Sequence, residues 1–197
     1  MITKSGKAVG PHQILTEYLK VFGQTFEPMM LKLIRKIFSQ NMYPDIWTIN
    51  FLKSIFKKGL ENDTNNFRGL AIGSSLGKLY SHILLNHLMI YIKDNSLISS
   101  NQIGFMKNAK TSDHIFLLQT IIEKVVKKNK KKLFPAFIDF KKEYDTVDRE
   151  KLIKRLKTLG MNGLFVRNID AMYSKIAYRI KLNSGDSEDI SSNLCLK

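Results

Sequence analysis

The stretch Leu133-Phe134-Pro135-Ala136-Phe137-Ile138-Asp139-Phe140 decides the fold that this sequence predicts. It reads as a short apolar strand that delivers one carboxylate, Asp139, at its end. Helical patterns flank the strand on both sides, so the sequence predicts an α/β chain. A strand end in such a protein is a usual place for a catalytic or metal-binding group. One carboxylate holds magnesium poorly, however, and no convincing partner follows Asp139 in the chain.

The charge balance of the chain predicts a polyanionic partner. The 197 residues include 32 Lys and Arg against 17 Asp and Glu, which gives a formal charge of +15. Phosphate neutralisation by such side chains supplies most non-specific affinity for nucleic acid. The alternative is that the lysines only keep the surface soluble, and charge alone leaves that alternative open. The hydrophobic content of 44% is enough to bury a core and excludes a disordered protein.

Cysteine usage and hydropathy predict an intracellular setting, nuclear or cytoplasmic. The single Cys195 excludes an intrachain disulfide framework and fits a reducing compartment. The first residues lack the apolar core of a signal peptide. No apolar run approaches the ~20 residues of a membrane span, so we expect no membrane partner.

Hydrophobic periodicity predicts mainly helices, with strands at 49–56 and 176–182 besides the one that carries Asp139. The strand at 176–182 is followed by a turn and is expected to have a hairpin partner at about 188–194. Asp148 is the expected N-cap of one helix, Gly160 its C-terminal stop, and Ser112 the expected cap of another. The expected helices span residues 14–22, 30–38, 76–91, 112–126, 149–159 and 164–173.

Several short motifs in a fixed order carry a family resemblance. Residues 133–148 resemble the first palm motif of reverse transcriptases from non-LTR retrotransposons. Each upstream motif is weak alone, but their order and separation together are specific and cover nearly the whole chain. The upstream motifs that resemble segments of this family are Gly10-Pro11-His12-Gln13-Ile14, Pro44-Asp45-Ile46-Trp47, Ile55-Phe56-Lys57-Lys58-Gly59, Asn66-Phe67-Arg68-Gly69-Leu70-Ala71-Ile72, Gln102-Ile103-Gly104-Phe105 and Thr111-Ser112-Asp113-His114-Ile115.

The resemblance implies an α/β (α+β) fold that is part of a right-hand polymerase. Residues 1–132 would form helical fingers, and residues 133–197 the start of an antiparallel palm sheet. The family activity is RNA-directed DNA synthesis, which implies an RNA template, a DNA primer, a dNTP and Mg2+. Residues 195–197 align just before the next palm motif, so the Asp-Asp pair of the metal site is expected outside this chain. We therefore expect the chain alone to be inactive and to self-associate through its uncovered palm surface.

The resemblance also implies a role for each of five residues. Asp139 would be the catalytic metal ligand, and the backbone carbonyl of Phe140 a second ligand. Tyr144 would lie against the sugar of the incoming nucleotide and exclude a 2′-hydroxyl. Lys57 and Arg68 would hold the triphosphate, a task that suits a point charge and a planar fork.

Each assignment has a structural alternative. Asp139 could be an ordinary turn acid, Tyr144 a half-buried core aromatic and Lys57 a surface lysine. Arg68 could cap a carbonyl or pair with Asp63. Glu143 departs from the family pattern, which has a small residue there, and it would repel the triphosphate. For the whole chain, the alternative function is a non-enzymatic, basic remnant that binds nucleic acid.

Overall fold

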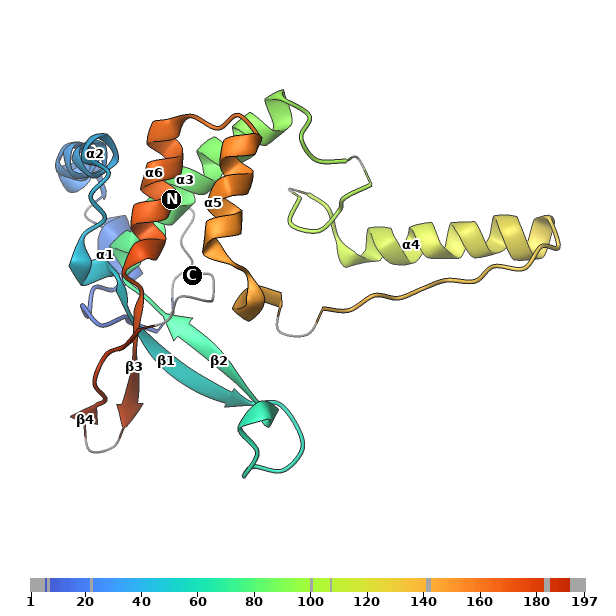
Figure 1. Cartoon of the computed structure of the whole chain (residues 1–197), viewed down its shortest axis with the longest axis horizontal. Helices are drawn as coiled ribbons and strands as arrows, with labels where there is room; N and C mark the ends of the chain where they lie inside the picture. The colour runs from blue at the N-terminus through green and yellow to red at the C-terminus, as the bar shows by residue number, and fades with distance from the viewer. Residues whose placement is uncertain are drawn as a thin grey trace. The chain divides into compact units, whose positions relative to one another are not determined.

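The structure, a computed structural model, describes residues 6, 8–21, 23–99, 101–106, 108–140, 143–182 and 185–191. The side chains of residues 23, 24, 144, 145 and 182 are outside the description. Contacts divide the chain into a first unit, residues 1–88 with 142–197, and a second unit, residues 89–141 (Figure 1). This division does not test the predicted boundary between fingers and palm, which stays a prediction.

The first unit is built around a mixed sheet with strand order β2-β1-β3-β4. Strand β1 (Ile49–Phe56) is antiparallel to β2 (Phe67–Ile72) and parallel to β3 (Ala177–Leu182). Two short strands, β4 (Gly185–Asp186) and β5 (Ile190–Ser191), pair with β3. The strands predicted at 49–56 and 176–182 are therefore confirmed. The predicted hairpin partner is present in part as β5, while residues 192–194 lie outside the described residues.

Helices surround one end of this sheet (Figure 1). Most of the predicted helices are confirmed, and Asp148 caps α5 as expected, because its Oδ1 accepts from the Lys151 N–H at 3.1 Å. Gly160 follows α5 with a positive φ of 79°, the conformation expected of a helix stop. The helices of this unit are α1 (Thr16–Val21), α2 (Gly23–Gln40), α3 (Ser75–Asp94, which continues into the second unit), α5 (Arg149–Thr158) and α6 (Gly163–Ser174), with short 3-10 turns η1 (Asp45–Trp47), η2 (Thr64–Asn66) and η4 (Glu143–Thr146).

The core lies where α2, α3, α5 and α6 meet. Its apolar members include Ile37, Leu84 and Val166, which are almost fully buried. At its centre the Tyr80 hydroxyl donates to Asn168 Oδ1 at 2.6 Å, with both residues inaccessible to water. Asn168 Nδ2 in turn donates to the carbonyls of Phe38 and Leu164, each at 2.8 Å. One buried amide therefore ties α2, α3 and α6 together.

The second unit contains α4 (Thr111–Ile122), which continues as the π-helix η3 (Glu123–Lys128). The predicted helix is confirmed, but its predicted cap is wrong. The helix begins before Ser112, because the Asp113 carboxylate accepts the Lys110 N–H at 2.8 Å and so caps the first turn. Among the described residues, no helix is both long and apolar enough to cross a membrane.

The prediction of a strand at 133–140 is wrong. These residues follow η3 as an extended stretch that has no regular secondary structure (Figure 1). A strand requires a neighbour to receive its backbone hydrogen bonds, and the described part of the chain gives this stretch none. Its apolar side chains are consequently exposed, with Phe137 and Ile138 each 82% accessible.

Candidate nucleic-acid interface

The strand register places five cations on one face of the sheet. Successive side chains of a strand alternate between faces, and Phe51 lies opposite Ile72 on β2 and Arg179 on β3. Odd residues of β1 and β3 therefore share a face with even residues of β2. The Lys57 N–H donates to the Asn66 carbonyl at 2.8 Å, which extends the pairing by one position beyond β1. One of the five, Arg179, forms an ion pair with Asp189. We call the other four cations, Lys53, Lys57, Arg68 and Lys181, the basic face.

The opposite face of the sheet lacks these cations. Near the start of β1 and β3, Asn50 and Tyr178 on this face are buried, at 1% and 7% exposure. Farther out, β1 and β2 continue as a two-stranded ribbon because β3 pairs only with residues 49–52 of β1. Phe56 and Phe67 pack against each other there, with ring centroids 5.3 Å apart. None of the described strand residues on this second face is a lysine or an arginine, so the ribbon carries its cations on one face only.

The cations of the ribbon have no acidic neighbour to neutralise them. Lys53, Lys57 and Arg68 are exposed and take part in none of the ion pairs found among the described residues. Asp63, the partner considered for Arg68, instead accepts the Asn65 N–H at 2.9 Å. These three side chains are therefore available to phosphate oxygens.

The β3 side of the same face is different. The Arg179 guanidinium makes two contacts with the Asp189 carboxylate, which raises the pKa of Arg179 and lowers the pKa of Asp189. Lys181 Nζ lies 5.9 Å from the Phe51 ring centroid, within range of a cation–π interaction. Most of the free positive charge of this face thus lies on the β1–β2 ribbon.

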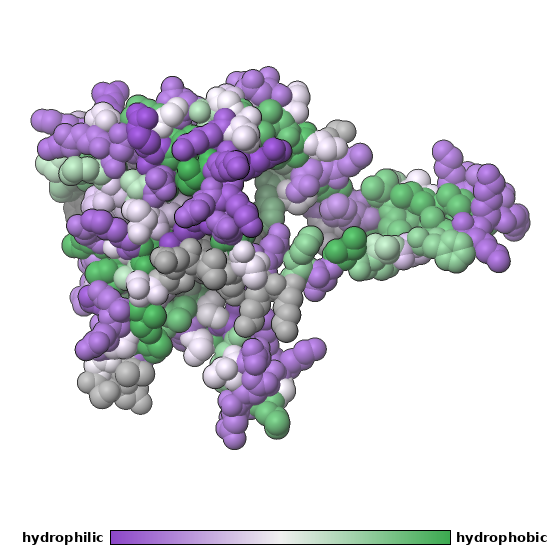
Figure 2. Space-filling model, viewed as in Figure 1, coloured by the Kyte–Doolittle hydropathy of each residue, from purple (hydrophilic) through white to green (hydrophobic). Residues whose placement is uncertain are grey.

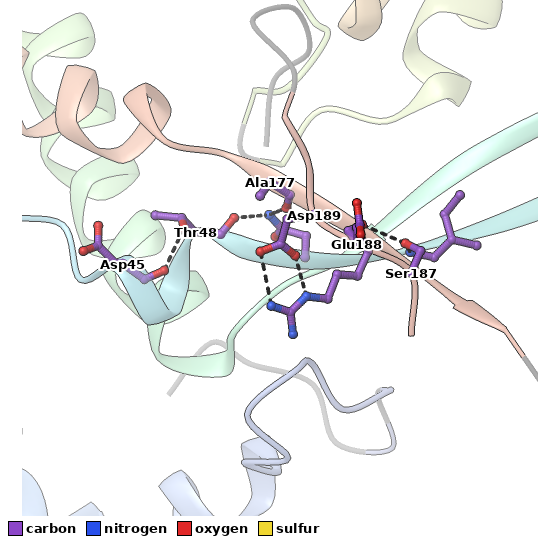
Figure 3. Close-up of polar contacts among 9 residues, drawn as sticks. Asp45, Thr48, Ala177, Ser187, Glu188 and Asp189 are labelled. Carbon is purple, nitrogen blue, oxygen red and sulfur yellow. Dashed lines mark hydrogen bonds and ion pairs between the residues drawn. The ribbon is translucent and has the colours of Figure 1, made fainter. Parts of the chain in front are cut away.

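Polar contacts at the base of the sheet hold β1 beside β3 (Figure 3). The Ala177 N–H donates to the Thr48 carbonyl at 3.2 Å, and the Thr48 hydroxyl donates to the Asp45 carbonyl at 2.7 Å. Lys175 Nζ contacts Asp45 Oδ1 at 2.9 Å. These contacts lie next to Ile49 and Ala177, the first pair of the parallel register. They therefore help to fix which side chains of β1 and β3 share a face.

The structure brings two of the five predicted site residues together. Lys57 and Arg68 lie on the same face of the ribbon, although their proposed contact with a triphosphate stays a prediction. The backbone of Tyr144 lies in η4 of the first unit. Asp139 and Phe140 belong to the second unit, where the Asp139 side chain is exposed and the Phe140 ring is 73% accessible.

The described residues do not assemble a magnesium site. Mg2+ requires several oxygen ligands in near-octahedral geometry. No group of three or more His, Cys, Asp or Glu side chains suited to a metal occurs in the described part of the chain. A single carboxylate at Asp139 does not hold the ion by itself. Its role as a metal ligand, with that of the Phe140 carbonyl, stays a prediction.

Sequence reasoning missed two members of the basic face. Lys53 lies four residues before Lys57 on a predicted strand, a spacing that places both on one face. Lys181 alternates with the apolar residues of β3 in the same way. The signal was therefore present within each strand, but the pairing of β1 with β3 that joins them is visible only in the structure.

The chain is similar to known polymerases. A model of the reverse transcriptase (RNA-dependent DNA polymerase) family matches residues 55–192. The probable RNA-directed DNA polymerase from transposon BS of Drosophila melanogaster is 25% identical over 118 residues, which cover 59% of this chain and 13% of that protein. The chain thus spans a small part of that relative's length.

A reverse transcriptase domain implies nucleic-acid substrates, and this family generally depends on divalent metal ions. The matches favour the polymerase interpretation over the alternative of a non-enzymatic remnant. Because the family model covers more than half of the sequence and includes Lys57, Arg68, α4 and Asp139, the chain belongs to the reverse transcriptase family.

Proposed function

We propose that this chain is part of a retrotransposon reverse transcriptase and that its basic face holds phosphates during RNA-directed DNA synthesis. The observation that carries the proposal is the register of the ribbon, which puts Lys53, Lys57 and Arg68 on one exposed face. Family membership and the charge of +15 support it from independent directions. The ligands of this face would be a template backbone and the triphosphate of a dNTP.

The chemistry of the three side chains suits this task. Arg68 presents a planar fork that makes two parallel charge-assisted hydrogen bonds to phosphate oxygens. Lys53 and Lys57 are flexible point charges that follow a phosphate without fixing its orientation. Magnesium, when bound in this family, would stabilise the attacking and leaving oxygens of nucleotidyl transfer. Tyr144 would limit the sugar to deoxynucleotides, as the resemblance implies.

The salt dependence of nucleic-acid binding tests this proposal. Each neutralised phosphate of a single strand contributes about 0.7 to the slope of log K against log salt. Replacing Lys53, Lys57 and Arg68 by Ala should therefore weaken binding of a mixed-sequence single-stranded RNA and reduce the slope by about 2. The measurement is a fluorescence-anisotropy titration at several salt concentrations.

A matched control removes the same charges elsewhere in the same unit. Lys32, Arg35 and Lys36 are exposed on α2 and comprise, like the test set, two lysines and one arginine. Their replacement by Ala should leave most of the affinity and most of the slope in place. If the two triple variants lose affinity equally, binding depends on net charge alone, and the basic face has no special role.

A further inference from the structure

Strand β3 contributes an arginine to the same side of the sheet as the basic face. Arg179 lies opposite Phe51 in the parallel register, so it is one strand over from Lys53 and two residues along. The spacing of strands and the rise along them put the Cα atoms of Arg179 and Lys53 roughly 8 Å apart. Hydrophilic residues predominate over the outer end of the β1–β2 ribbon (Figure 2). A nucleic-acid backbone that follows the ribbon inward would therefore pass within reach of Arg179.

Both oxygens of the Asp189 carboxylate contact the Arg179 guanidinium. Nε donates to Oδ1, and Nη2 donates to Oδ2 at 3.2 Å, so the contact is bidentate (Figure 3). A phosphodiester offers arginine the same arrangement, since it carries one negative charge and two oxygens that are free to accept. The carboxylate therefore fills the place that two phosphate oxygens would take on this side chain.

A β-bulge brings Asp189 to this position. The registers of β3 with β4 and with β5 differ by one residue, so residues 187–189 lie opposite only two residues of β3. Such an extra residue is a β-bulge, a device that re-aims side chains. The Ser187 side chain closes the bulge, because its Oγ accepts the Ile180 N–H at 2.9 Å. The β5 register, continued to the bulge, puts Asp189 directly opposite Arg179 and on the same face.

We propose that Arg179 is a fifth cationic position for phosphate on this surface, and that the Asp189 carboxylate occupies it until a phosphodiester of a bound single strand takes its place. This rests on the proposed function, in which the neighbouring cations hold phosphates. The exchange replaces one bidentate anion by another on the same planar fork. The carboxylate also holds the guanidinium in position while no nucleic acid is bound, which reduces the entropy lost on binding.

The ion pair is weak enough to be exchanged. The Arg179 and Asp189 side chains are 34% and 43% accessible, so water reaches both partners. Ion pairs at such exposure shift an equilibrium by at most roughly fivefold. A phosphodiester that belongs to a strand already held by the basic face can displace the carboxylate at that cost. Removing the carboxylate should accordingly raise the affinity for nucleic acid by a similar factor.

Neutralising the competing carboxylate tests the proposal. Asp189→Asn keeps the shape of the side chain and removes its charge. Asp186→Asn is the matched control, because Asp186 lies opposite Lys181 at the same edge of the sheet. Asp186 acts on Arg179 only through space and takes part in none of the ion pairs found in the described part of the chain. The two variants therefore lose the same charge from the same surface.

Both variants are made in the parent chain and in an Arg179→Gln background, and are titrated with a mixed-sequence single-stranded RNA by fluorescence anisotropy at several salt concentrations. In the parent chain, Asp189→Asn should bind RNA roughly twofold to fivefold more tightly than Asp186→Asn. In the Arg179→Gln background the two substitutions should have equal effects, because the fork that binds phosphate is gone. Adding Arg179→Gln to Asp189→Asn should also lower the slope of log K against log salt by about 0.7, the contribution of one phosphate.

Equal affinities of Asp189→Asn and Asp186→Asn in the parent chain would overturn the proposal, since Asp189 would then act only through net charge. An excess that persists without Arg179 would overturn it as well. The triple Ala variant of the basic face separates this inference from the proposed function. If the triple variant loses affinity while the two Asn variants bind alike, the basic face stands and the phosphate position at Arg179 fails. If the triple variant binds like the parent while the excess that depends on Arg179 remains, the reverse holds. RNA binding by none of the variants overturns both.

Discussion

Removing the buried amide of Asn168 should destabilise the first unit severely. Asn168→Ala leaves the Tyr80 hydroxyl and the Phe38 carbonyl without their partner at a site from which water is excluded. Each buried polar group left unpaired costs about 1–3 kcal/mol, and a small cavity adds to that. The expected loss is therefore about 3–5 kcal/mol of unfolding free energy. Tyr80→Phe removes a single hydrogen bond and should cost about 1–2 kcal/mol.

The two substitutions should not be additive, because they remove the same hydrogen bond. In a double-mutant cycle, Tyr80→Phe with Asn168→Ala should cost about 1–2 kcal/mol less than the sum of the single changes. Urea unfolding followed by circular dichroism measures these values. Tyr18→Phe is the matched control, because Tyr18 is 51% exposed. An Asn168→Ala variant within about 0.5 kcal/mol of the parent would refute the reasoning.

The same tyrosine predicts an alkaline transition. Burial raises the pKa of Tyr80 from 10.0 to about 12, since the core disfavours the phenolate. Its contribution is therefore fully present below pH 10 and is lost as the pH rises from 10 to about 12. Burial raises the pKa of Tyr43 as well, so Tyr80→Phe should reduce the alkaline loss of stability without abolishing it. An unchanged pH dependence in Tyr80→Phe would contradict this expectation.

Three further predictions concern the ligand site, the helix cap and a close approach of backbone. Arg68→Ala should weaken dNTP binding more than Arg68→Lys, and the Lys variant should still bind more weakly than the parent because lysine lacks the planar fork. Calorimetric titration of dNTP tests this, and equal dNTP affinities of the two variants would contradict it. The Lys151 N–H lowers the pKa of the Asp148 carboxyl, so the cap is strongest above the ordinary pKa of that group and weakens as the pH falls through the lowered value. Asp148→Ala should accordingly lower the Tm at neutral pH, with a difference from the parent that narrows in acid; a constant difference in scanning calorimetry would argue against the charged cap. Gly10→Ala would place its Cβ 2.2 Å from the Gly73 carbonyl oxygen and should cost about 1–3 kcal/mol in urea unfolding, whereas Gly104→Ala, whose Cβ would meet nothing nearer than 3.6 Å, should be nearly neutral.

A last prediction concerns catalysis. The purified chain should not extend a primer even at high magnesium, because two-metal displacement needs several ligands and Asp139 supplies one carboxylate. The assay is extension of a labelled DNA primer on an RNA template. Template-dependent synthesis that Asp139→Ala abolishes would overturn this prediction and exclude a contaminating polymerase as its source.

Elements with a strong local signal could be predicted from the sequence. Strand β1 is rich in β-branched and aromatic residues and is followed by Lys57-Lys58-Gly59, while α3 and α6 follow apolar stripes of helical period. Strand β2 was not predicted as a strand, because Gly69 interrupts its short apolar run and its stability comes from pairing with β1. The failure at 133–140 has the same origin, since apolar composition favours a strand but only a neighbour forms one.

The candidate site shows the same limit. The resemblance indicated Lys57 and Arg68 separately, and nothing in their local sequence puts them on one face. That arrangement follows from the antiparallel register, in which Ile55 lies opposite Arg68 and Lys57 opposite Asn66. Register depends on the turn at residues 58–66 and on contacts at the base of the sheet, which involve residues more than a hundred positions apart. Local patterns do not contain such pairings.

The place of β1 between β2 and β3 has a consequence for synthesis on the ribosome. Its antiparallel partner β2 begins at Phe67, soon after β1 ends at Phe56, but its parallel partner β3 begins only at Ala177. At translation rates of about 5–20 residues per second, the edge of β1 that pairs with β3 stays unpaired for roughly 5–20 s. During this time the nascent hairpin exposes an unpaired edge to other chains. Chaperone occupancy should therefore be highest while the ribosome translates the segment between β2 and β3, and it should fall once β3 has emerged.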